Sequence, residues 1–199
     1  MKQREILRKE RLAARDRLGA AQRRSRSEQI QARLLEQSII RDAGHLFIYV
    51  HFRSEVETLG LIAHCLAAGK KVSVPVTLRE ESLLLAVQLT DPATQLEPGC
   101  FGILEPTAEQ IAQATIDPAD IDVVLVPGSV FAPDGGRLGY GGGYYDRFLT
   151  RNAPRARRIG AAYAVQMIER VPMELHDQYM DIIITEQQVY ECGKLREGM

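Results

Sequence analysis

The chain has 199 residues, of which 45% are hydrophobic and 26% are charged, so it can bury one core and is too apolar to be intrinsically disordered. Its longest apolar runs are far too short to cross a bilayer, and its first residues do not open into the apolar stretch of a secretory signal. Three widely spaced cysteines, Cys65, Cys100 and Cys192, argue against a disulfide framework and a zinc site. We expect a single domain over residues 1–199, in a cytoplasmic, monomeric protein that does not enter a membrane.

Charge divides the chain into a basic arm, residues 1–41, and an acidic body, residues 45–190. The arm carries 12 Lys and Arg residues against 5 Asp and Glu residues, a net charge of +7, and the rest of the chain has a net charge of −8. Attraction between these opposite charges favours docking of the arm on the body.

The arm has no proline and consists mostly of strong helix formers, which predicts helices. The first should run from about Arg4 to Leu18. The sequence from Ser25 to Glu28 has the Ser-x-x-Glu form of a capping box and predicts that a second helix begins there, with its apolar residues stacked along one face.

The body alternates strand and helix patterns. The sequence predicts a strand at His45–Val50, a helix around 59–67 that ends near Gly69, and a strand at Val72–Val76, which together form a βαβ unit. Residues 97–120 look rich in loops. Further strands are expected at Leu83–Leu89, at Ile121–Val126 in the centre of the sheet, at Arg158–Ala164 and at Asp181–Thr185. These patterns predict a three-layer α/β fold preceded by a basic helical arm.

A glycine-rich segment follows the predicted central strand. Six of the nine residues from Gly135 to Gly143 are glycine, and an amphipathic turn follows them. Backbone without side chains can approach an anion closely, and the next helix adds its positive end. Gly142 and Gly143 replace the Lys-Ser/Thr of a Walker A loop, and Tyr144 replaces the last glycine of a dinucleotide fingerprint. A flexible hairpin is the alternative interpretation.

Two charged residues near this segment favour a phosphate site over a plain hairpin. Arg137 can grip a phosphate or carboxylate with its planar guanidinium group. Asp146 can bind a magnesium ion that a nucleotide brings with it.

The run from Arg137 to Asp146, Arg-Leu-Gly-x-Gly-x-Gly-Tyr-Tyr-Asp, resembles the signature of the 5-formyltetrahydrofolate cyclo-ligase family, also called 5,10-methenyltetrahydrofolate synthetase. The resemblance covers essentially the whole chain. It implies a Rossmann-like, mostly parallel sheet and a folate enzyme of one-carbon metabolism. The implied reaction uses ATP and Mg²⁺ to convert 5-formyltetrahydrofolate into 5,10-methenyltetrahydrofolate, with release of ADP and phosphate.

The resemblance also implies roles for particular residues. Catalysis is assigned to Arg137 and Tyr145, substrate binding to Val50, Glu55 and Tyr145, and metal binding to Asp146 and Asp177. ATP binding is assigned to Arg4, Arg8, Arg137, Leu138, Gly139, Tyr140, Gly141, Gly142, Gly143, Tyr144 and Tyr145.

Two of these assignments, and one further residue, need comment. Arg4 stands where the family usually has lysine, and Lys2 is a nearby alternative. Glu55 belongs to a Glu-x-Glu-Thr run that is otherwise typical of a helix N-terminus. Among the histidines, only His51 falls at a predicted strand end beside the expected folate site.

The glycine-rich segment departs from some members of the family, which place basic residues at the positions of Tyr140 and Gly142. We therefore expect Arg137 and the arginines of the arm to meet the phosphate charge, and Arg137→Ala to impair turnover more than loss of Arg4 or Arg8.

Two other functions remain open. The first keeps the ATP site but changes the acceptor, as in another amide-activating cyclase or kinase. The second is a nucleic-acid-binding module that uses the basic arm, although the arm lacks interleaved aromatic residues and any recognisable RNA-binding motif. We expect no nucleic-acid partner.

Overall fold

The computed structural model describes residues 2–99 and 103–193. Its α-helices are α1 (Lys2–Asp16), α2 (Ala20–Glu36), α3 (Ser38–Asp42), α4 (Leu59–Ala67), α5 (Pro92–Gln95), α6 (Ala108–Ala114) and α7 (Tyr144–Arg151), and two short 3₁₀ helices are η2 (Pro118–Asp120) and η3 (Ala164–Gln166). Its strands are β1 (His45–Ile48), β2 (Lys71–Leu78), β3 (Leu83–Leu89), β4 (Leu96–Pro98), β5 (Leu104–Pro106), β6 (Thr115–Ile116), β7 (Val123–Val126), β8 (Val130–Phe131), β9 (Arg137–Leu138), β10 (Arg157–Ala161), β11 (Ile182–Ile184) and β12 (Val189–Glu191).

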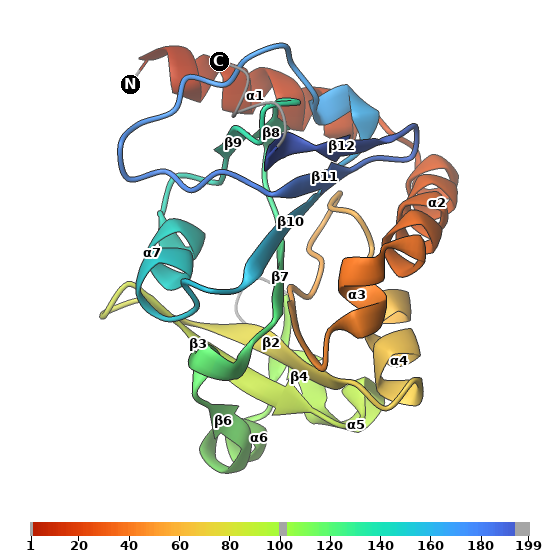
Figure 1. Ribbon diagram of the computed structural model, residues 1–199, viewed down its shortest axis with the longest axis vertical. Helices are drawn as coiled ribbons and strands as arrows, with labels where there is room; N and C mark the ends of the chain where they lie inside the picture. Colours follow the sequence, from red (N-terminus) through yellow and green to blue (C-terminus); the bar gives the residue numbers. More distant parts are fainter. Residues whose placement is uncertain (1, 100–102, 194–199) are drawn as a thin grey trace.

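An eight-stranded sheet in the order β12-β11-β10-β7-β1-β2-β3-β6 forms the centre of the molecule (Figure 1). Neighbouring strands from β11 to β2 are parallel, whereas β12, β3 and β6 add antiparallel edges. The central place of β7 and the mostly parallel sheet confirm the predictions from sequence. The first crossover, β1-α4-β2, is the predicted βαβ unit.

Successive side chains of a buried strand point to opposite faces of the sheet, so both faces are apolar and each packs against helices. The sheet and its two helical coverings are the three layers. In β1, the side chains of Leu46 and Ile48 pack on one face with residues of α2, α3 and α4. Phe47 points to the other face, where it stacks on Phe148 of α7 with ring centroids 4.6 Å apart. Each face of the sheet is thus covered by helices, as an α/β fold requires.

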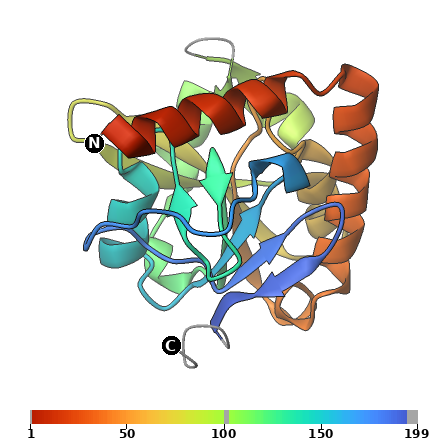
Figure 2. The same ribbon diagram turned by 90° about the horizontal axis from the view of Figure 1, so that it is seen from above.

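Helix α1 lies apart from these layers and crosses one end of the sheet, over the β8–β9 hairpin (Figure 2). It matches the predicted first helix closely. The predicted start of the second helix at Ser25 is wrong, because α2 begins at Ala20. The Gln22 side chain accepts a hydrogen bond from the Gly19 N–H (3.1 Å), so the helix is capped one and a half turns earlier than the Ser-x-x-Glu pattern indicates.

Several short elements were not predicted. The two-residue strand β8 precedes the glycine-rich segment and the two-residue strand β9 lies within it, and residues 97–120 contain β5, α6 and β6. Strands of two or three residues are too short to carry a periodic signal. Strand β1 ends at Ile48, before the predicted end at Val50.

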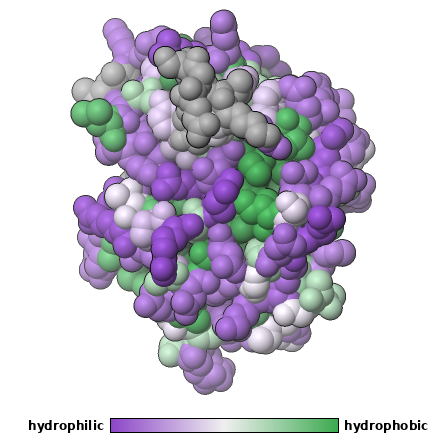
Figure 3. Space-filling view, in the orientation of Figure 1, coloured by the Kyte–Doolittle hydropathy of each residue, from purple (hydrophilic) through white to green (hydrophobic). Residues whose placement is uncertain are grey.

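The outer surface seen in Figure 3 is largely hydrophilic, with one hydrophobic area near its centre. Across 2–99 and 103–193, no helix combines the length and the apolar character needed to span a membrane. Cys65 and Cys192 are buried, and Cys100 lies outside the described residues.

Candidate active site

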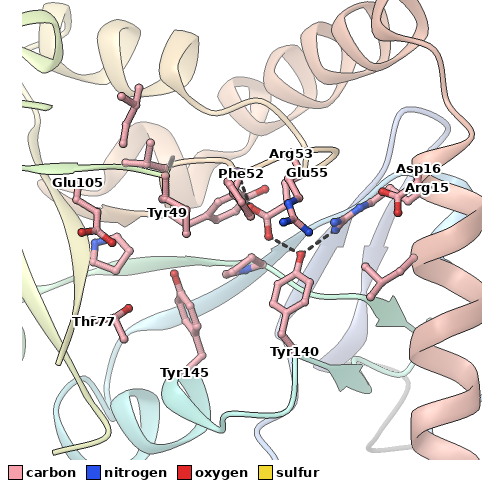
Figure 4. A pocket seen from close by; sticks show the side chains of 16 residues that line it. Arg15, Asp16, Tyr49, Phe52, Arg53, Glu55, Thr77, Glu105, Tyr140 and Tyr145 are labelled. Carbon is pink, nitrogen blue, oxygen red and sulfur yellow. Dashed lines mark hydrogen bonds between the residues drawn. The ribbon is translucent and has the colours of Figure 1, made fainter. Parts of the chain in front are cut away.

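Two adjoining cavities open where β1, β2 and β7 end, beneath α1. The larger has a volume of about 450 Å³ and the smaller about 150 Å³. Both are lined by Pro75, Thr77, Pro127, Tyr140 and Tyr145. Figure 4 shows Tyr140 and Tyr145 pointing into the larger cavity from the glycine-rich segment and α7. In open α/β sheets, ligands bind at this carboxyl edge.

The glycine-rich segment has a defined conformation. After the β8–β9 hairpin, Gly141 and Gly143 have φ angles of +101° and +66°, which a residue with a side chain rarely adopts. Gly143 is the N-cap of α7. The Arg147 guanidinium donates to the Gly142 carbonyl (2.8 Å) and to the Ser82 carbonyl (3.0 Å), which ties the segment to the β2–β3 turn. The segment therefore contains a hairpin, but one that is held in place.

Arg137 is buried, with 3% of its surface exposed, and lines the smaller cavity. Its Nη2 atom pairs with Oδ1 of Asp146 at 2.8 Å, and its Nη1 atom donates to the Pro127 carbonyl at 3.1 Å. Its Nε atom is buried without a hydrogen-bond partner among the described residues. The predicted phosphate-binding arginine and a predicted metal-binding acid therefore contact each other.

Helix α1 presents a row of arginines to the site. Arg4, Arg8, Arg11 and Arg15 are three or four residues apart and so share one face of the helix. Arg4 pairs with Asp177 and Glu174, each at 2.9 Å. The next two donate to backbone carbonyls, Arg8 to Gly139 at 2.9 Å and Arg11 to Val165 at 3.4 Å.

Lys2 and the arginines of this row differ in their contacts. The Lys2 side chain is exposed and forms no ion pair or hydrogen bond within residues 2–99 and 103–193. Arg4 and Arg8, by contrast, both contact segments that carry predicted site residues.

The two predicted metal-binding acids lie close together. The backbone N–H of Gln178, the residue after Asp177, donates to Oδ1 of Asp146 at 3.0 Å. Within the described ranges, no three His, Cys, Asp or Glu side chains form a group that could hold a metal ion. Two carboxylates are nevertheless suited to Mg²⁺ when phosphate oxygens and water complete its coordination, so the donor set fits a metal that arrives with a nucleotide.

The larger cavity contains the predicted substrate-binding residues. Val50 and Glu55 both line it. Glu55 accepts hydrogen bonds from the Phe52 N–H (2.8 Å) and from the Tyr140 hydroxyl. Burial raises the pKa of Glu55, while the contacts with Tyr140, Phe52 and Arg15 oppose that rise.

Tyr145 lies where the two cavities meet. Its hydroxyl is buried and has no hydrogen-bond partner in the part of the chain that the structure describes. Burial raises the pKa of this hydroxyl, so it is a neutral donor at physiological pH. A buried polar atom without a partner is costly, which makes Tyr145 a candidate contact for a ligand.

His51, which the sequence offers as an additional candidate for the substrate site, has a local hydrogen-bond partner. His51 does not line the larger cavity, because its ring Nδ1 atom accepts a hydrogen bond from the Thr58 N–H at 3.2 Å. Thr58 in turn donates from its hydroxyl to the Tyr49 carbonyl at 2.7 Å. These contacts fix the turn that carries Glu55.

Sequence reasoning missed Arg15 and Arg147. Arg15 donates to the Tyr140 hydroxyl at 2.8 Å and to the Ser54 hydroxyl at 3.0 Å. The regular spacing of arginines along the first helix was a signal that pointed to Arg15, since it continues the face of Arg4 and Arg8. Arg147 had no comparable signal, because its partners are backbone carbonyls.

Comparisons with known proteins identify the family of the chain. The model of the 5-formyltetrahydrofolate cyclo-ligase family matches residues 1–186. A 5-formyltetrahydrofolate cyclo-ligase of Haemophilus influenzae is 32% identical over 155 residues, which cover 76% of this chain and 79% of the relative. A probable 5-formyltetrahydrofolate cyclo-ligase of Caenorhabditis elegans is 28% identical over 169 residues, covering 80% of this chain and 81% of the relative.

Among solved structures, the NMR structure of Aquifex aeolicus 5,10-methenyltetrahydrofolate synthetase has a TM-score of 0.81 and 30% sequence identity, and the match covers 95% of this chain and 92% of that one. That likeness confirms the mixed α/β fold. With the family model matched over nearly the whole chain, the protein belongs to the 5-formyltetrahydrofolate cyclo-ligase family and is a ligase.

Proposed function

We propose that the protein uses ATP and Mg²⁺ to convert 5-formyltetrahydrofolate into 5,10-methenyltetrahydrofolate, releasing ADP and phosphate. The observation that carries this proposal is the shared wall of the two cavities. Tyr140 and Tyr145 line both the cavity beside the glycine-rich segment and the larger apolar cavity. A phosphoryl donor and a folate bound in them would meet at that wall.

The proposed reaction overcomes the poor reactivity of an amide. The γ-phosphoryl group passes to the formyl oxygen, N10 attacks the formyl carbon, and phosphate leaves with that oxygen as the ring closes. Such chemistry depends mainly on positioning and on neutralising negative charge. A bound Mg²⁺ ion would supply part of that neutralisation, held by Asp146 and Asp177.

The phosphates are proposed to bind along Leu138 to Tyr145, with Arg137 as the main cation and Arg4 and Arg8 in support. Arg137 and Arg4 each pair with an acid of the proposed metal site, at 2.8 Å and 2.9 Å. Binding of a magnesium nucleotide would exchange these partners, so that each arginine turns to phosphate and each carboxylate to the metal. Each arginine and each carboxylate would therefore have a partner of opposite charge both before and after the nucleotide binds.

The substrate is proposed to bind in the larger cavity. Val50 would wall the pterin, and Glu55 would accept hydrogen bonds from its amino and N–H groups. The Tyr145 hydroxyl, which has no described partner, would donate to the reacting end of the folate. This assigns Tyr145 and Arg137 to catalysis.

One observation weighs on the nucleic-acid alternative. The arginines on one face of α1 are turned toward the body of the protein, so they do not form an outward-facing basic surface for nucleic acid. The second alternative, an ATP-dependent cyclase or kinase with another acceptor, differs only in what the larger cavity binds. Monomeric state and cytoplasmic location stay predictions.

An absorbance assay tests the proposal. Purified protein with ATP, Mg²⁺ and 5-formyltetrahydrofolate should produce the near-ultraviolet absorbance of the methenyl bridge, and omission of ATP or addition of EDTA should abolish it. ATP binding without any new absorbance would instead favour a different acceptor.

A further inference from the structure

The Tyr140 hydroxyl joins three segments that are far apart in the sequence. It accepts a hydrogen bond from Nη1 of Arg15 on α1 (2.8 Å) and donates one to Oε1 of Glu55 in the β1–α4 loop. Figure 4 shows these two hydrogen bonds meeting at the end of the Tyr140 side chain. The glycine-rich segment is thereby connected to the helix above it and to the wall of the larger cavity.

Arg15 anchors this connection. Only 5% of its surface is exposed, and its Nε atom also donates to the Ser54 hydroxyl (3.0 Å), the residue before Glu55. Its guanidinium carbon lies 5.8 Å from the centre of the Tyr140 ring. A buried guanidinium with several fixed partners is expensive to move, so it holds Tyr140 and the Ser54–Glu55 turn in one arrangement.

Tyr140 itself belongs to the part of the glycine-rich segment that is proposed to bind the phosphates. It is 51% exposed and lies between Gly139 and Gly141, and no neighbouring side chain in the segment restricts it. Its hydroxyl contact with Glu55 is thus the link through which movement of the segment reaches the substrate cavity.

We infer that Tyr140 is a positioning residue that couples the two cavities, orienting the Glu55 carboxylate for the folate when the glycine-rich segment closes on the triphosphate. This inference rests on the proposed function. Because coupling between two sites is reciprocal, nucleotide should raise the affinity for folate by the same factor as folate raises the affinity for nucleotide.

Binding measurements on Tyr140→Phe test the coupling. The dissociation constant of 5-formyltetrahydrofolate is measured without and with saturating Mg²⁺ and a non-hydrolysable ATP analogue. In the parent protein, the analogue should tighten folate binding about fivefold or more. In the variant, this factor should fall to near one, and folate binding alone should weaken about tenfold, since the Glu55 carboxylate loses the donor that holds it in one orientation.

Tyr190→Phe is the matched control, because Tyr190 lies on β12, away from both cavities, and should keep the coupling. An unchanged coupling factor in Tyr140→Phe would overturn the inference. A double-mutant cycle with Glu55→Gln separates positioning from packing, since the two changes should be strongly non-additive if Tyr140 acts through Glu55. Additive losses would also overturn it.

Amide hydrogen exchange keeps this test distinct from that of the proposed function. In ligand-free protein, Tyr140→Phe should speed exchange at the Phe52 N–H, which donates to Glu55, whereas Tyr190→Phe should not. Failure of the parent to bind 5-formyltetrahydrofolate would contradict the proposed function alone. Unchanged exchange at Phe52 would contradict the link between Tyr140 and Glu55.

Discussion

The two edges of the central sheet differ in how their charged residues are used. The amino edge holds a cavity of about 520 Å³, no smaller than the candidate substrate cavity of about 450 Å³ at the carboxyl edge. It is also rich in charge, with Asp42, Asp120 and Asp122 among its lining residues. Neither volume nor charge therefore distinguishes the candidate site.

At the amino edge, acids hold the starts of strands. Oδ2 of Asp122 accepts hydrogen bonds from the Gly44 and His45 amides, at 2.8 and 2.9 Å. Asp181 does the same for the Arg158 amide, at 2.8 Å, and forms an ion pair with the exposed side chain of Arg157, at 3.4 Å. Such contacts satisfy backbone groups that the first residues of a strand would otherwise leave open.

At the carboxyl edge, acids form buried ion pairs with arginines. Asp146 and Asp177 each accept one backbone amide but also bind a guanidinium group, from Arg137 and Arg4. The same edge contains the buried Tyr145 hydroxyl, which lacks a described partner. A guanidinium can exchange a carboxylate for a phosphate without leaving its place, whereas a strand amide cannot change partners without unfolding. Exchangeable charge, more than volume, marks the candidate site.

The Arg137→Ala substitution should have the largest effect, because it removes an arginine of the carboxyl edge. Removal of the guanidinium takes away the main cation proposed for the phosphates, and turnover should fall about a hundredfold or more. It also leaves Asp146 partly buried without its ion-pair partner, so the free energy of unfolding should fall by about 3 kcal/mol. The methenyl absorbance assay and urea unfolding measure the two effects.

Arg4→Ala and Arg8→Ala provide the comparison, since their side chains lie at the periphery of the site and should impair turnover less. Arg137→Lys keeps the charge but not the planar pair of donors, and should recover only part of the activity. If Arg137→Ala turns over like the parent, the assignment of Arg137 to catalysis is wrong.

Sequence reasoning could point to one part of the candidate site because the residues of that part follow one another. The residues from Arg137 to Asp146 form a continuous run, and glycines in that run predict a close approach of the backbone to a ligand. The strands also follow from the sequence, because β3 and β7 are apolar along their length. Both kinds of signal are local.

What sequence reasoning missed depends on distant contacts. The start of α2 is set by Gly19 and Gln22, and Ser27, inside the expected capping box, instead bonds to the Tyr163 hydroxyl at 2.8 Å. Arg15 reaches Tyr140 across 125 positions in the chain. Propensity and spacing do not report the Ser27–Tyr163 and Arg15–Tyr140 contacts, since these exist only once the arm has docked, whereas the contact between Gly19 and Gln22 is local.

The pH dependence of folate binding gives a second, smaller test. Burial raises the pKa of Glu55, so the folded protein takes up this proton at a higher pH than the unfolded chain does. Folding accordingly becomes less favourable as the pH rises through the interval between the ordinary and the raised pKa. Binding of 5-formyltetrahydrofolate should strengthen through the same interval, because only the ionised carboxylate accepts hydrogen bonds at both oxygens.

Titration calorimetry across that interval measures this dependence. The Glu55→Gln variant should bind 5-formyltetrahydrofolate more weakly, and its affinity should lose the pH dependence that Glu55 causes. Any pH dependence that comes from titration of the folate itself should persist in both proteins. A parallel pH dependence in parent and variant would exclude Glu55 as the titrating group.

Asp122→Ala should have the smallest effect, and it tests the amino edge. The Gly44 and His45 amides lose a charged acceptor, and the free energy of unfolding should fall by about 1–2 kcal/mol in urea titrations. Turnover at saturating substrate should not change, because the start of β1 lies at the opposite end of the strand from Val50 and Glu55. A loss of turnover without a loss of stability would show that the amino edge takes part in function, and the distinction between structural and exchangeable acids would then fail.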